Sequence, residues 1–189
     1  MSKGKIIVFT APSGAGKTTI KKRVLEDYPD FIFSVSATTR KKRETETEGI
    51  DYFFISEAEF ELKIKNDEFI EWEKFYDYYY GTLKSFVEEK ISEGKTIVLD
   101  VDVKGALSIK SIFPDSLVIY ISPPSLDVLE TRLVKRKTET DADLQKRIER
   151  AEMELSFKDK FDCSVVNDEI EETVKNVKEI INKFLLKED

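Results

Sequence analysis

The chain has 189 residues, of which 40% are hydrophobic and 37% charged, and its formal net charge is −7. This length suits one domain with an added lobe or lid, and it allows a hydrophobic core without disulfide or metal staples. The sequence has no histidine, which excludes histidine-based catalysis and Cys/His zinc sites. Cys163 is the only cysteine, so an internal disulfide cannot form. The negative net charge disfavours a protein that binds nucleic acid polymers.

Short β-rich apolar runs alternate with longer helical patterns along most of the chain. The apolar runs predict strands at 5–10, 31–35, 96–100, 117–122 and 164–167. The helical patterns predict helices at 18–27, 103–112, about 125–136 and 169–186. Continuous apolar strands separated by helices are typical of a parallel sheet covered on both faces, so we predict an α/β fold.

Two stretches interrupt this alternation. Residues 36–83 are rich in aromatic side chains and contain strand-like pieces at 52–55 and 69–75, which predicts an inserted small mixed β/α lobe. Residues 137–143 are polar and are followed by a further helical pattern, so we interpret them as a mobile lid. We expect a single domain over 1–189, with a core of about 1–35, 84–136 and 159–189, a lobe of about 36–83 and a helical lid of about 137–158.

The sequence also bears on where the protein acts. No apolar run approaches the roughly 20 residues that span a bilayer, and residues 1–9 lack the long apolar core of a signal peptide. A single cysteine suits a reducing compartment. We therefore expect a cytoplasmic protein without a membrane partner.

The segment APSGAGKT, from Ala11 to Thr18, lies between a predicted strand and a predicted helix. Apart from Ala11 in place of the first glycine, it matches the phosphate-binding P-loop pattern Gly-x4-Gly-Lys-Ser/Thr. Gly14 and Gly16 let the backbone fold around an anion, to which the helix N-terminus is attractive. Lys17 can reach the β- and γ-phosphates of a nucleotide, and Thr18 can hold Mg²⁺. The alternative is a glycine-rich turn that binds nothing.

A P-loop predicts a nucleotide but not a reaction. Residues 102–105 match the D-x-x-G pattern of GTPases, which is short and unspecific. A GTPase would also carry an Asn-Lys-x-Asp motif that recognises guanine, and the sequence has none, because residues 182–185 lack the aspartate.

The predicted lobe and the strands after it add a second group of signals. In order along the chain they are SATTR at 36–40, Arg43, Glu46, GIDYFF at 49–54, EFIEW at 68–72, YYGT at 79–82, IVLDVD at 97–102 and VVND at 165–168. Together with the P-loop, and in this order and spacing, they resemble the guanylate kinase family from about residue 5 to 186. The resemblance implies a P-loop NTPase-type parallel sheet with a GMP-binding lobe and a helical lid.

The resemblance also implies an activity, the transfer of the γ-phosphate of ATP to GMP (and to dGMP) with Mg²⁺ as the cofactor. On the ATP side it implies binding by Ala11, Pro12, Ser13, Gly14, Ala15, Gly16, Lys17, Thr18, Thr19, Arg132, Arg136 and Asn167. Asp100 would act near Mg²⁺ through water, together with Thr18. Lys17, Arg40, Arg136 and Arg147 are the residues expected to act on the transferred phosphoryl group.

On the GMP side the resemblance assigns the phosphate to Arg40, Arg43, Tyr52 and Tyr80, and the base to Ser36, Glu71 and Thr82, with Glu46 and Asp102 as further ligands. The chemistry agrees. Guanidinium groups and phenol hydroxyls suit a dianion. Guanine presents donors at N1 and N2 to a carboxylate that only accepts, whereas adenine presents an acceptor at N1 and would be rejected.

Some positions depart from the family pattern. Lys42 and Thr45 stand where proline and glycine are usual, so the loop around Glu46 could adopt another path. Lys135 and Lys137 replace glycines beside Arg136, and Lys104 replaces a glutamine.

Two other functions stay open: an inactive guanylate-kinase-like module that binds phosphorylated peptides, and a kinase for another nucleoside monophosphate such as AMP or UMP.

Overall fold

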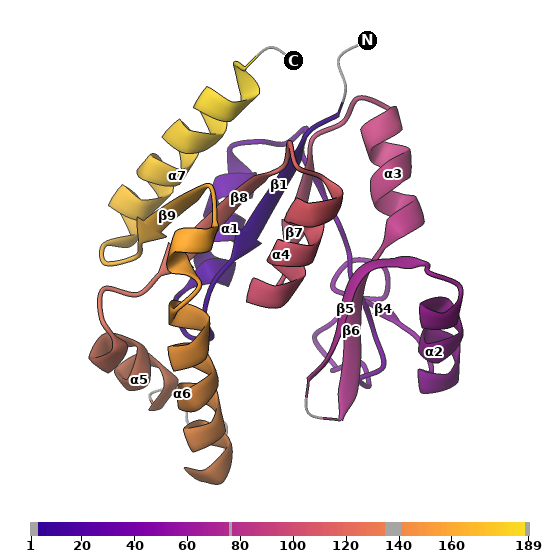
Figure 1. The fold of residues 1–189 in the computed structure, drawn as a ribbon, viewed down its shortest axis with the longest axis horizontal. Helices are drawn as coiled ribbons and strands as arrows, with labels where there is room; N and C mark the ends of the chain where they lie inside the picture. Colours follow the sequence, from indigo (N-terminus) through magenta and orange to yellow (C-terminus); the bar gives the residue numbers. More distant parts are fainter. Residues whose placement is uncertain (1–3, 76, 135–140, 188–189) are drawn as a thin grey trace. The chain divides into compact units, whose positions relative to one another are not determined.

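The computed structural model describes residues 4–75, 77–134 and 141–187 (Figure 1). The chain divides into two compact units. The first contains residues 1–6, 31–99 and 107–116, and the second contains 7–30, 100–106 and 117–189. These units do not follow the division into core, lobe and lid that we expect from the sequence, which stays a prediction.

A five-stranded sheet has the strand order β2-β7-β1-β8-β9. Its strands are β1 (Ile6–Thr10), β2 (Ile32–Phe33), β7 (Ile97–Asp100), β8 (Leu117–Ser122) and β9 (Cys163–Val166). The pairings of β2 with β7, β1 with β8 and β8 with β9 are parallel. Every residue of β1 and β8 is buried, as expected for strands covered on both faces. The predicted parallel α/β sheet is confirmed.

Helices follow the strands of this sheet: α1 (Lys17–Glu26), α4 (Val103–Ile112), α5 (Leu126–Val134), α6 (Asp141–Leu155) and α7 (Ile170–Leu185), with a 3-10 turn at Lys158–Lys160. Helix α1 packs against α7, and α5 packs against α6 (Figure 1). The spacing of the apolar residues explains the contact between α1 and α7. Ile20 and Val24 are buried one turn apart on α1, and Val177 and Ile181 repeat this spacing on α7.

The expected lid falls only partly within the described residues. Residues 137–140 lie outside them. Residues 141–143 already belong to α6, so the prediction that helix resumes after Asp143 is wrong by one turn. Leu129 and Leu133 of α5 form an apolar cluster with Ile148 and Ala151 of α6, and this cluster fixes the two helices to each other.

A second, four-stranded sheet has the order β4-β3-β6-β5 and is mixed. Its strands are β3 (Ala37–Thr38), β4 (Phe53–Phe54), β5 (Phe69–Phe75) and β6 (Tyr78–Leu83), and helices α2 (Glu57–Lys65) and α3 (Lys84–Ser92) belong to the same unit. Phe60 of α2 stacks on Phe69 and Tyr79 with ring centroids 4.3 and 5.2 Å apart. A Cβ on Gly81 would lie 2.9 Å from Phe69, so glycine lets these rings lie against β6.

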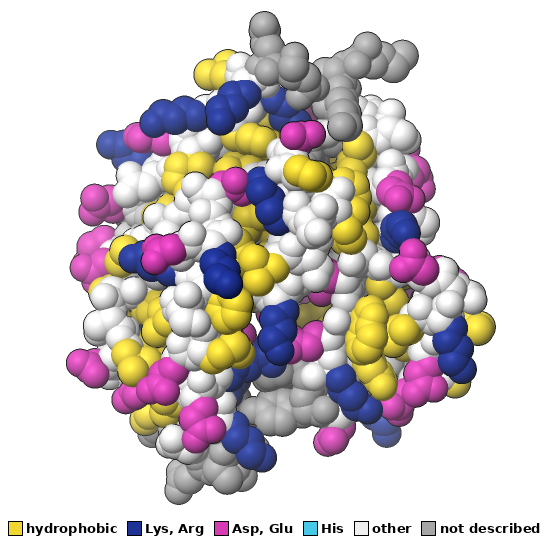
Figure 2. Space-filling view, in the orientation of Figure 1, with side chains coloured by type: hydrophobic (Ala, Val, Ile, Leu, Met, Phe, Trp, Pro, Cys, Tyr) yellow, Lys and Arg dark blue, Asp and Glu magenta, His cyan; other side chains and the backbone are white. Residues whose placement is uncertain are grey.

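The surface mixes both signs of charge. On the face drawn in Figure 2, basic and acidic side chains lie interspersed among apolar and neutral ones. Among the described residues, no helix has both the length and the apolar character that a membrane span needs.

Candidate functional site

The glycine-rich loop lies between β1 and α1, as predicted. Gly14 and Gly16 have φ of +90° and +95°, a backbone conformation that other residues rarely adopt. The N–H of Ala15 donates to the carbonyl of Pro12 at 3.1 Å and closes the turn. All of α1 is described, and its first turn contains no acidic side chain. The loop and the helix N-terminus therefore form a cradle suited to an anion.

Asn167 holds this loop in place. Its side chain is buried and donates from Nδ2 to the carbonyl of Ala15 at 2.7 Å, while its backbone N–H donates to the carbonyl of Ser122 at 2.7 Å. Arg132 of α5 donates to the carbonyl of Asn167 at 3.0 Å. A Cβ on Gly16 would lie 2.2 Å from Nδ2 of Asn167. Asn167 thus lies against the loop and Arg132 contacts Asn167, and both residues are expected on the ATP side.

Asp100, at the end of β7, joins two lysines of α1. Lys17 Nζ lies 2.5 Å from Oδ1 of Asp100 and 2.7 Å from the carbonyl of Val101, and Lys21 Nζ lies 2.5 Å from Oδ2. Burial favours a raised pKa for the Asp100 carboxyl, but the charges of Lys17 and Lys21 outweigh it, so the pKa lies below its usual value. Thr18 and Thr19, next on α1, are exposed.

Asp102 directly precedes α4 and caps its first turn. Its Oδ1 accepts from the N–H of Gly105 at 2.7 Å, and its Oδ2 accepts from Arg150 of α6 at 2.9 Å. Arg150 also donates from Nε to Glu154 at 2.8 Å, and Glu154 accepts from the N–H of Ser13 at 3.3 Å. The phosphate loop, α4 and α6 are therefore joined by one chain of polar contacts.

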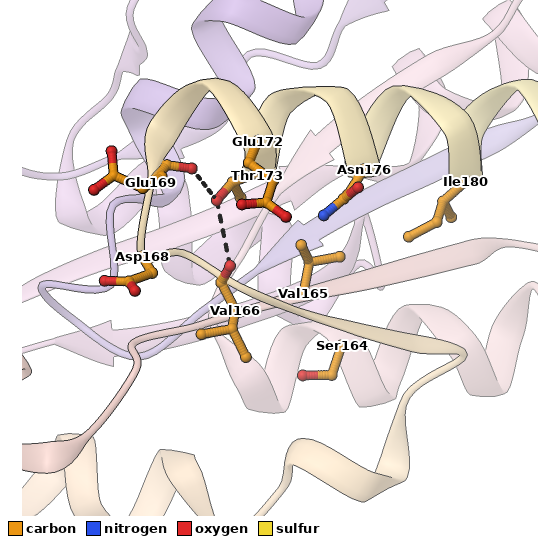
Figure 3. Close-up of a pocket in the computed structure, with 9 residues that line it drawn as sticks. All are labelled: Ser164, Val165, Val166, Asp168, Glu169, Glu172, Thr173, Asn176 and Ile180. Carbon is orange, nitrogen blue, oxygen red and sulfur yellow. Dashed lines mark hydrogen bonds between the residues drawn. The ribbon is translucent and has the colours of Figure 1, made fainter.

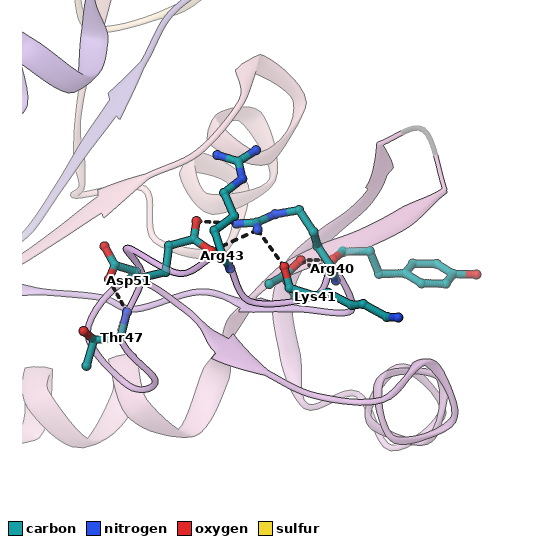
Figure 4. A network of polar contacts seen from close by, with 8 residues as sticks. Arg40, Lys41, Arg43, Thr47 and Asp51 are labelled. Atoms are coloured by element: carbon teal, nitrogen blue, oxygen red, sulfur yellow. Dashed lines mark hydrogen bonds and ion pairs between the residues drawn. The ribbon is translucent and has the colours of Figure 1, made fainter. Parts of the chain in front are cut away.

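In the other unit, Arg40 lies beside Arg43, one of its predicted companions (Figure 4). Its guanidinium forms a two-pronged pair with Glu46, at 3.0 and 2.7 Å, and its Cζ lies 5.4 Å from the ring centre of Tyr52. Tyr80 contacts both Arg40 and Tyr52, with 5.9 Å between the two tyrosine rings. The N–H of Arg43 donates to Glu46 at 2.8 Å, and its side chain is exposed.

These contacts perturb the titration of Glu46. The guanidinium of Arg40 and then the backbone N–H of Arg43 lower the pKa of Glu46 to about 2, from a usual 4.5. The same pair raises the pKa of Arg40. Glu46 is therefore ionised at neutral pH, where its carboxylate holds the guanidinium of Arg40 in place.

Glu71 and Thr82 face each other across β5 and β6. They are a register pair, and the Thr82 hydroxyl donates to the Glu71 carboxylate at 2.5 Å. Thr82 is buried, whereas Glu71 is half-buried. Ser36, just before β3, is half-buried and accepts at its carbonyl from the N–H of Phe53 at 2.9 Å. The sequence-predicted base-recognition residues thus lie in the same unit as Arg40, Tyr52 and Tyr80.

The remaining predicted residues are the lid arginines. Arg147 lies in α6 and is half-buried, whereas Arg136 falls outside the described residues. Sequence reasoning did not assign Lys21, Arg150 or Glu154. Lys21 had a usable signal, because it follows Lys17 by one helical turn and must share its face. Glu154 is one acid in a run of charges, and its burial has no signal in the sequence.

A pocket of about 410 Å³ lies between β9 and α7 (Figure 3). Its lining is Ser164, Val165, Val166, Asp168, Glu169, Glu172, Thr173, Asn176 and Ile180, which includes none of the predicted site residues. The carboxylates of Asp168, Glu169 and Glu172 would repel a nucleotide phosphate. This pocket is therefore not the nucleotide site.

Comparisons with known proteins agree with this geometry. A family model described as guanylate kinase matches residues 3–184. The guanylate kinase of Chlorobium luteolum is 49% identical over 96% of this chain and 93% of its own length, and that of Thermotoga maritima is 49% identical over 95% and 86%. The crystal structure of guanylate kinase from Anaplasma phagocytophilum has a TM-score of 0.79 at 29% identity, over 99% of this chain and 89% of that one. The chain belongs to the guanylate kinase family.

Proposed function

We propose that this protein is an active guanylate kinase, which converts ATP and GMP to ADP and GDP. The observation that carries the proposal is the Glu71–Thr82 pair, a carboxylate and a hydroxyl held 2.5 Å apart across two strands in a chain of this family. A carboxylate accepts from the N1 and N2 donors of guanine and has no partner to offer the N1 of adenine. Ser36 would complete recognition of the base.

The GMP phosphate would bind to the cluster around Arg40. Arg40 and Arg43 supply guanidinium groups, and Tyr52 and Tyr80 supply hydroxyls that donate to phosphate oxygens. Glu46 orients Arg40, and we place Asp102 on the GMP side as well. These assignments use the base and the phosphate but not the ribose 2′-hydroxyl, so we expect dGMP to be a substrate too.

The triphosphate of ATP would lie in the loop of residues 11–19. Backbone N–H groups of the loop and the N-terminus of α1 would bind its phosphates, with Asn167 and Arg132 keeping the loop in shape. Lys17, which pairs with Asp100 at 2.5 Å, would turn its charge toward the β- and γ-phosphates.

The residues present fit Mg²⁺. This ion takes oxygen ligands and usually keeps several waters, so one hydroxyl and one carboxylate suffice beside the phosphates. Thr18 offers an exposed hydroxyl at the start of α1. Both oxygens of Asp100 contact lysines, so this carboxylate would act through water. Bound there, Mg²⁺ would neutralise charge on the β- and γ-phosphates.

The reaction needs little beyond positioning and charge. An oxygen of the GMP phosphate, already anionic, forms a bond to the γ-phosphorus, the bond from that phosphorus to the β–γ bridging oxygen breaks, and its electron pair stays on ADP. No histidine base is required. Arg40, Arg136 and Arg147, with Lys17, would stabilise the transferred group, and closure by residues 137–143, the part of the lid that we interpret as mobile, would exclude water as a competing acceptor.

We also propose the setting of the reaction. The core would comprise about 1–35, 84–136 and 159–189 and the GMP lobe about 36–83. The enzyme would act in the cytoplasm, in purine nucleotide metabolism, with nucleotides rather than nucleic acid polymers or membranes as its partners.

A coupled assay of ADP release across GMP, dGMP, AMP, UMP and CMP tests the proposal. We expect turnover with GMP and dGMP, loss of turnover in Lys17→Met, and almost none with the other acceptors. Equal rates with AMP or UMP would indicate another monophosphate kinase. A folded protein without turnover would indicate a binding module.

A further inference from the structure

We propose that Glu154 and Arg150 of α6 are positioning residues of the phosphate-transfer site, which hold the phosphate loop and Asp102 in fixed register with the helix that carries Arg147. The inference rests on the proposed function and concerns contacts within one compact unit. The chain of contacts runs from Ser13 through Glu154 and Arg150 to Asp102.

Glu154 is anchored at both ends. Its backbone carbonyl accepts from the hydroxyl of Tyr120, a fully buried residue of β8, at 3.0 Å. The residue is 4% exposed, and its carboxylate accepts from the N–H of Ser13 and from Arg150. A carboxylate this buried is costly unless it is paired and hydrogen-bonded, so its partners must occupy defined positions. One of them is a peptide N–H of the loop that would bind the triphosphate.

Arg150 transmits this restraint to Asp102. Its guanidinium bridges two carboxylates, donating from Nε to Glu154 at 2.8 Å and from a terminal nitrogen to Asp102 at 2.9 Å. The planar fork of an arginine can span two acceptors in fixed geometry, whereas lysine offers a single nitrogen on a flexible stem. Charge alone would not maintain the link, which depends on the shape of the guanidinium.

The contacts of Glu154 and Arg150 matter for catalysis because Arg147 lies on the same helix. Arg147 precedes Arg150 by three residues on α6, about 4.5 Å along the helix axis. An arginine that stabilises the transferred phosphoryl group must be placed within a fraction of an ångström relative to the loop that holds ATP. Anchoring α6 to Ser13 and Asp102 supplies that placement. The sequence pattern of the phosphate loop does not predict this placement, because both anchoring residues, Arg150 and Glu154, lie more than 130 positions later in the chain.

The test compares Glu154→Gln, Arg150→Lys, Arg150→Met and the double variant Glu154→Gln/Arg150→Met with a matched control, Glu152→Gln, which makes the same charge change at an exposed site of α6. Glutamine has one acceptor oxygen, so its amide N–H₂ must oppose a donor, Ser13 N–H or Arg150. We expect Glu154→Gln to raise the KM for ATP on the order of tenfold and to lower kcat, with the KM for GMP within about twofold of wild type.

Arg150→Lys and Arg150→Met are expected to lower kcat by a similar factor, on the order of tenfold, because both lose the bridge. The double variant should lose no more than the worse single variant. Thermal unfolding of each variant separates positioning from folding. Lower unfolding midpoints with unchanged kcat and KM would show that the chain only stabilises the fold, and full activity in Arg150→Lys would show that charge is enough. Either result overturns the inference.

The same experiment separates this inference from the proposed function. If wild-type protein forms no GDP, the proposed function fails. If wild type and Glu152→Gln are active and the Glu154 and Arg150 variants match them, the function stands and the positioning role is refuted.

Discussion

Replacing Gly16 by alanine would place a methyl carbon 2.2 Å from Nδ2 of Asn167, in a backbone conformation with φ of +95°. Carbon atoms attached to the backbone do not approach side chains this closely, so Asn167 must move. When it moves, the 2.7 Å hydrogen bond from Asn167 to the carbonyl of Ala15 breaks. One methyl group thus both strains the phosphate loop and removes the side chain that holds it.

The magnitude follows from these two effects. A non-glycine residue in the left-handed region costs roughly 1–2 kcal/mol. A buried polar group that loses its partner costs about 1–3 kcal/mol more. We therefore expect Gly16→Ala to lower the free energy of unfolding by about 2–5 kcal/mol. Because the loop would bind ATP, the variant should also lose ATP affinity.

Gly49 provides a matched control. It has φ of +73°, but a Cβ there would meet nothing nearer than a ring carbon of Phe53 at 3.7 Å. Gly49→Ala should therefore cost only the backbone strain, about 1–2 kcal/mol. Urea unfolding of wild type and of both variants gives the comparison. Asn167→Ala should cost less in the Gly16→Ala background than in wild type, by about 1 kcal/mol or more, because its bond is already broken there.

Equal destabilisation by Gly16→Ala and Gly49→Ala would refute this reasoning, since it would mean that Asn167 does not restrain the loop. Additive effects of Gly16→Ala and Asn167→Ala would lead to the same conclusion.

Three further predictions follow from single contacts. Glu71→Gln should raise the KM for GMP at least about tenfold and leave the KM for ATP nearly unchanged, because the amide presents a donor to guanine N1 or N2. Equal rises in KM for both nucleotides in steady-state kinetics would contradict guanine recognition by Glu71. Glu46 has a pKa lowered from 4.5 to about 2, so its pairing with Arg40 stabilises the fold above pH 4.5, and that stabilisation is lost as the pH falls toward 2. The difference in unfolding midpoint between wild type and Glu46→Gln should therefore shrink between pH 4.5 and 2. A difference that stays constant over this range would rule the pairing out. Tyr120→Phe removes one of two donors to the carbonyl of Glu154, which keeps the N–H of Phe157 at 3.3 Å. It should therefore cost about 0.5–1.5 kcal/mol in urea unfolding, the net contribution of one hydrogen bond. A change within experimental error would argue against that bond.

The sequence predicts the elements whose pattern is continuous. The bounds of α4 and β8 agree with prediction to the residue, because Val103–Ile112 and Leu117–Ser122 are uninterrupted patterns between clear breaks. Strand β3 has only two residues and no periodicity to detect. Helix α2 was missed although a signal existed, since Ser56 is followed three residues later by Glu59 and its hydroxyl accepts from that N–H at 3.2 Å.

In the candidate site, too, the sequence predicts some residues and not others. The phosphate loop and the pairing of Glu71 with Thr82 involve motif residues, so the resemblance was enough to single them out. The supporting contacts depend on burial and tertiary geometry. Nothing in the run of charges on α6 distinguishes Glu154, which is 4% exposed, from the exposed Glu152 two residues before it. Only the packing of α6 against the loop and β8 makes the difference.

Transfer of label from ATP carrying ³²P at the γ-position is the most direct test of whether this protein phosphorylates GMP. With Mg²⁺ and equal amounts of GMP and AMP as acceptors, we predict that the label appears in GDP and that Lys17→Met abolishes the transfer. Label released as free phosphate, or present in ADP formed from AMP as much as in GDP, would contradict the account.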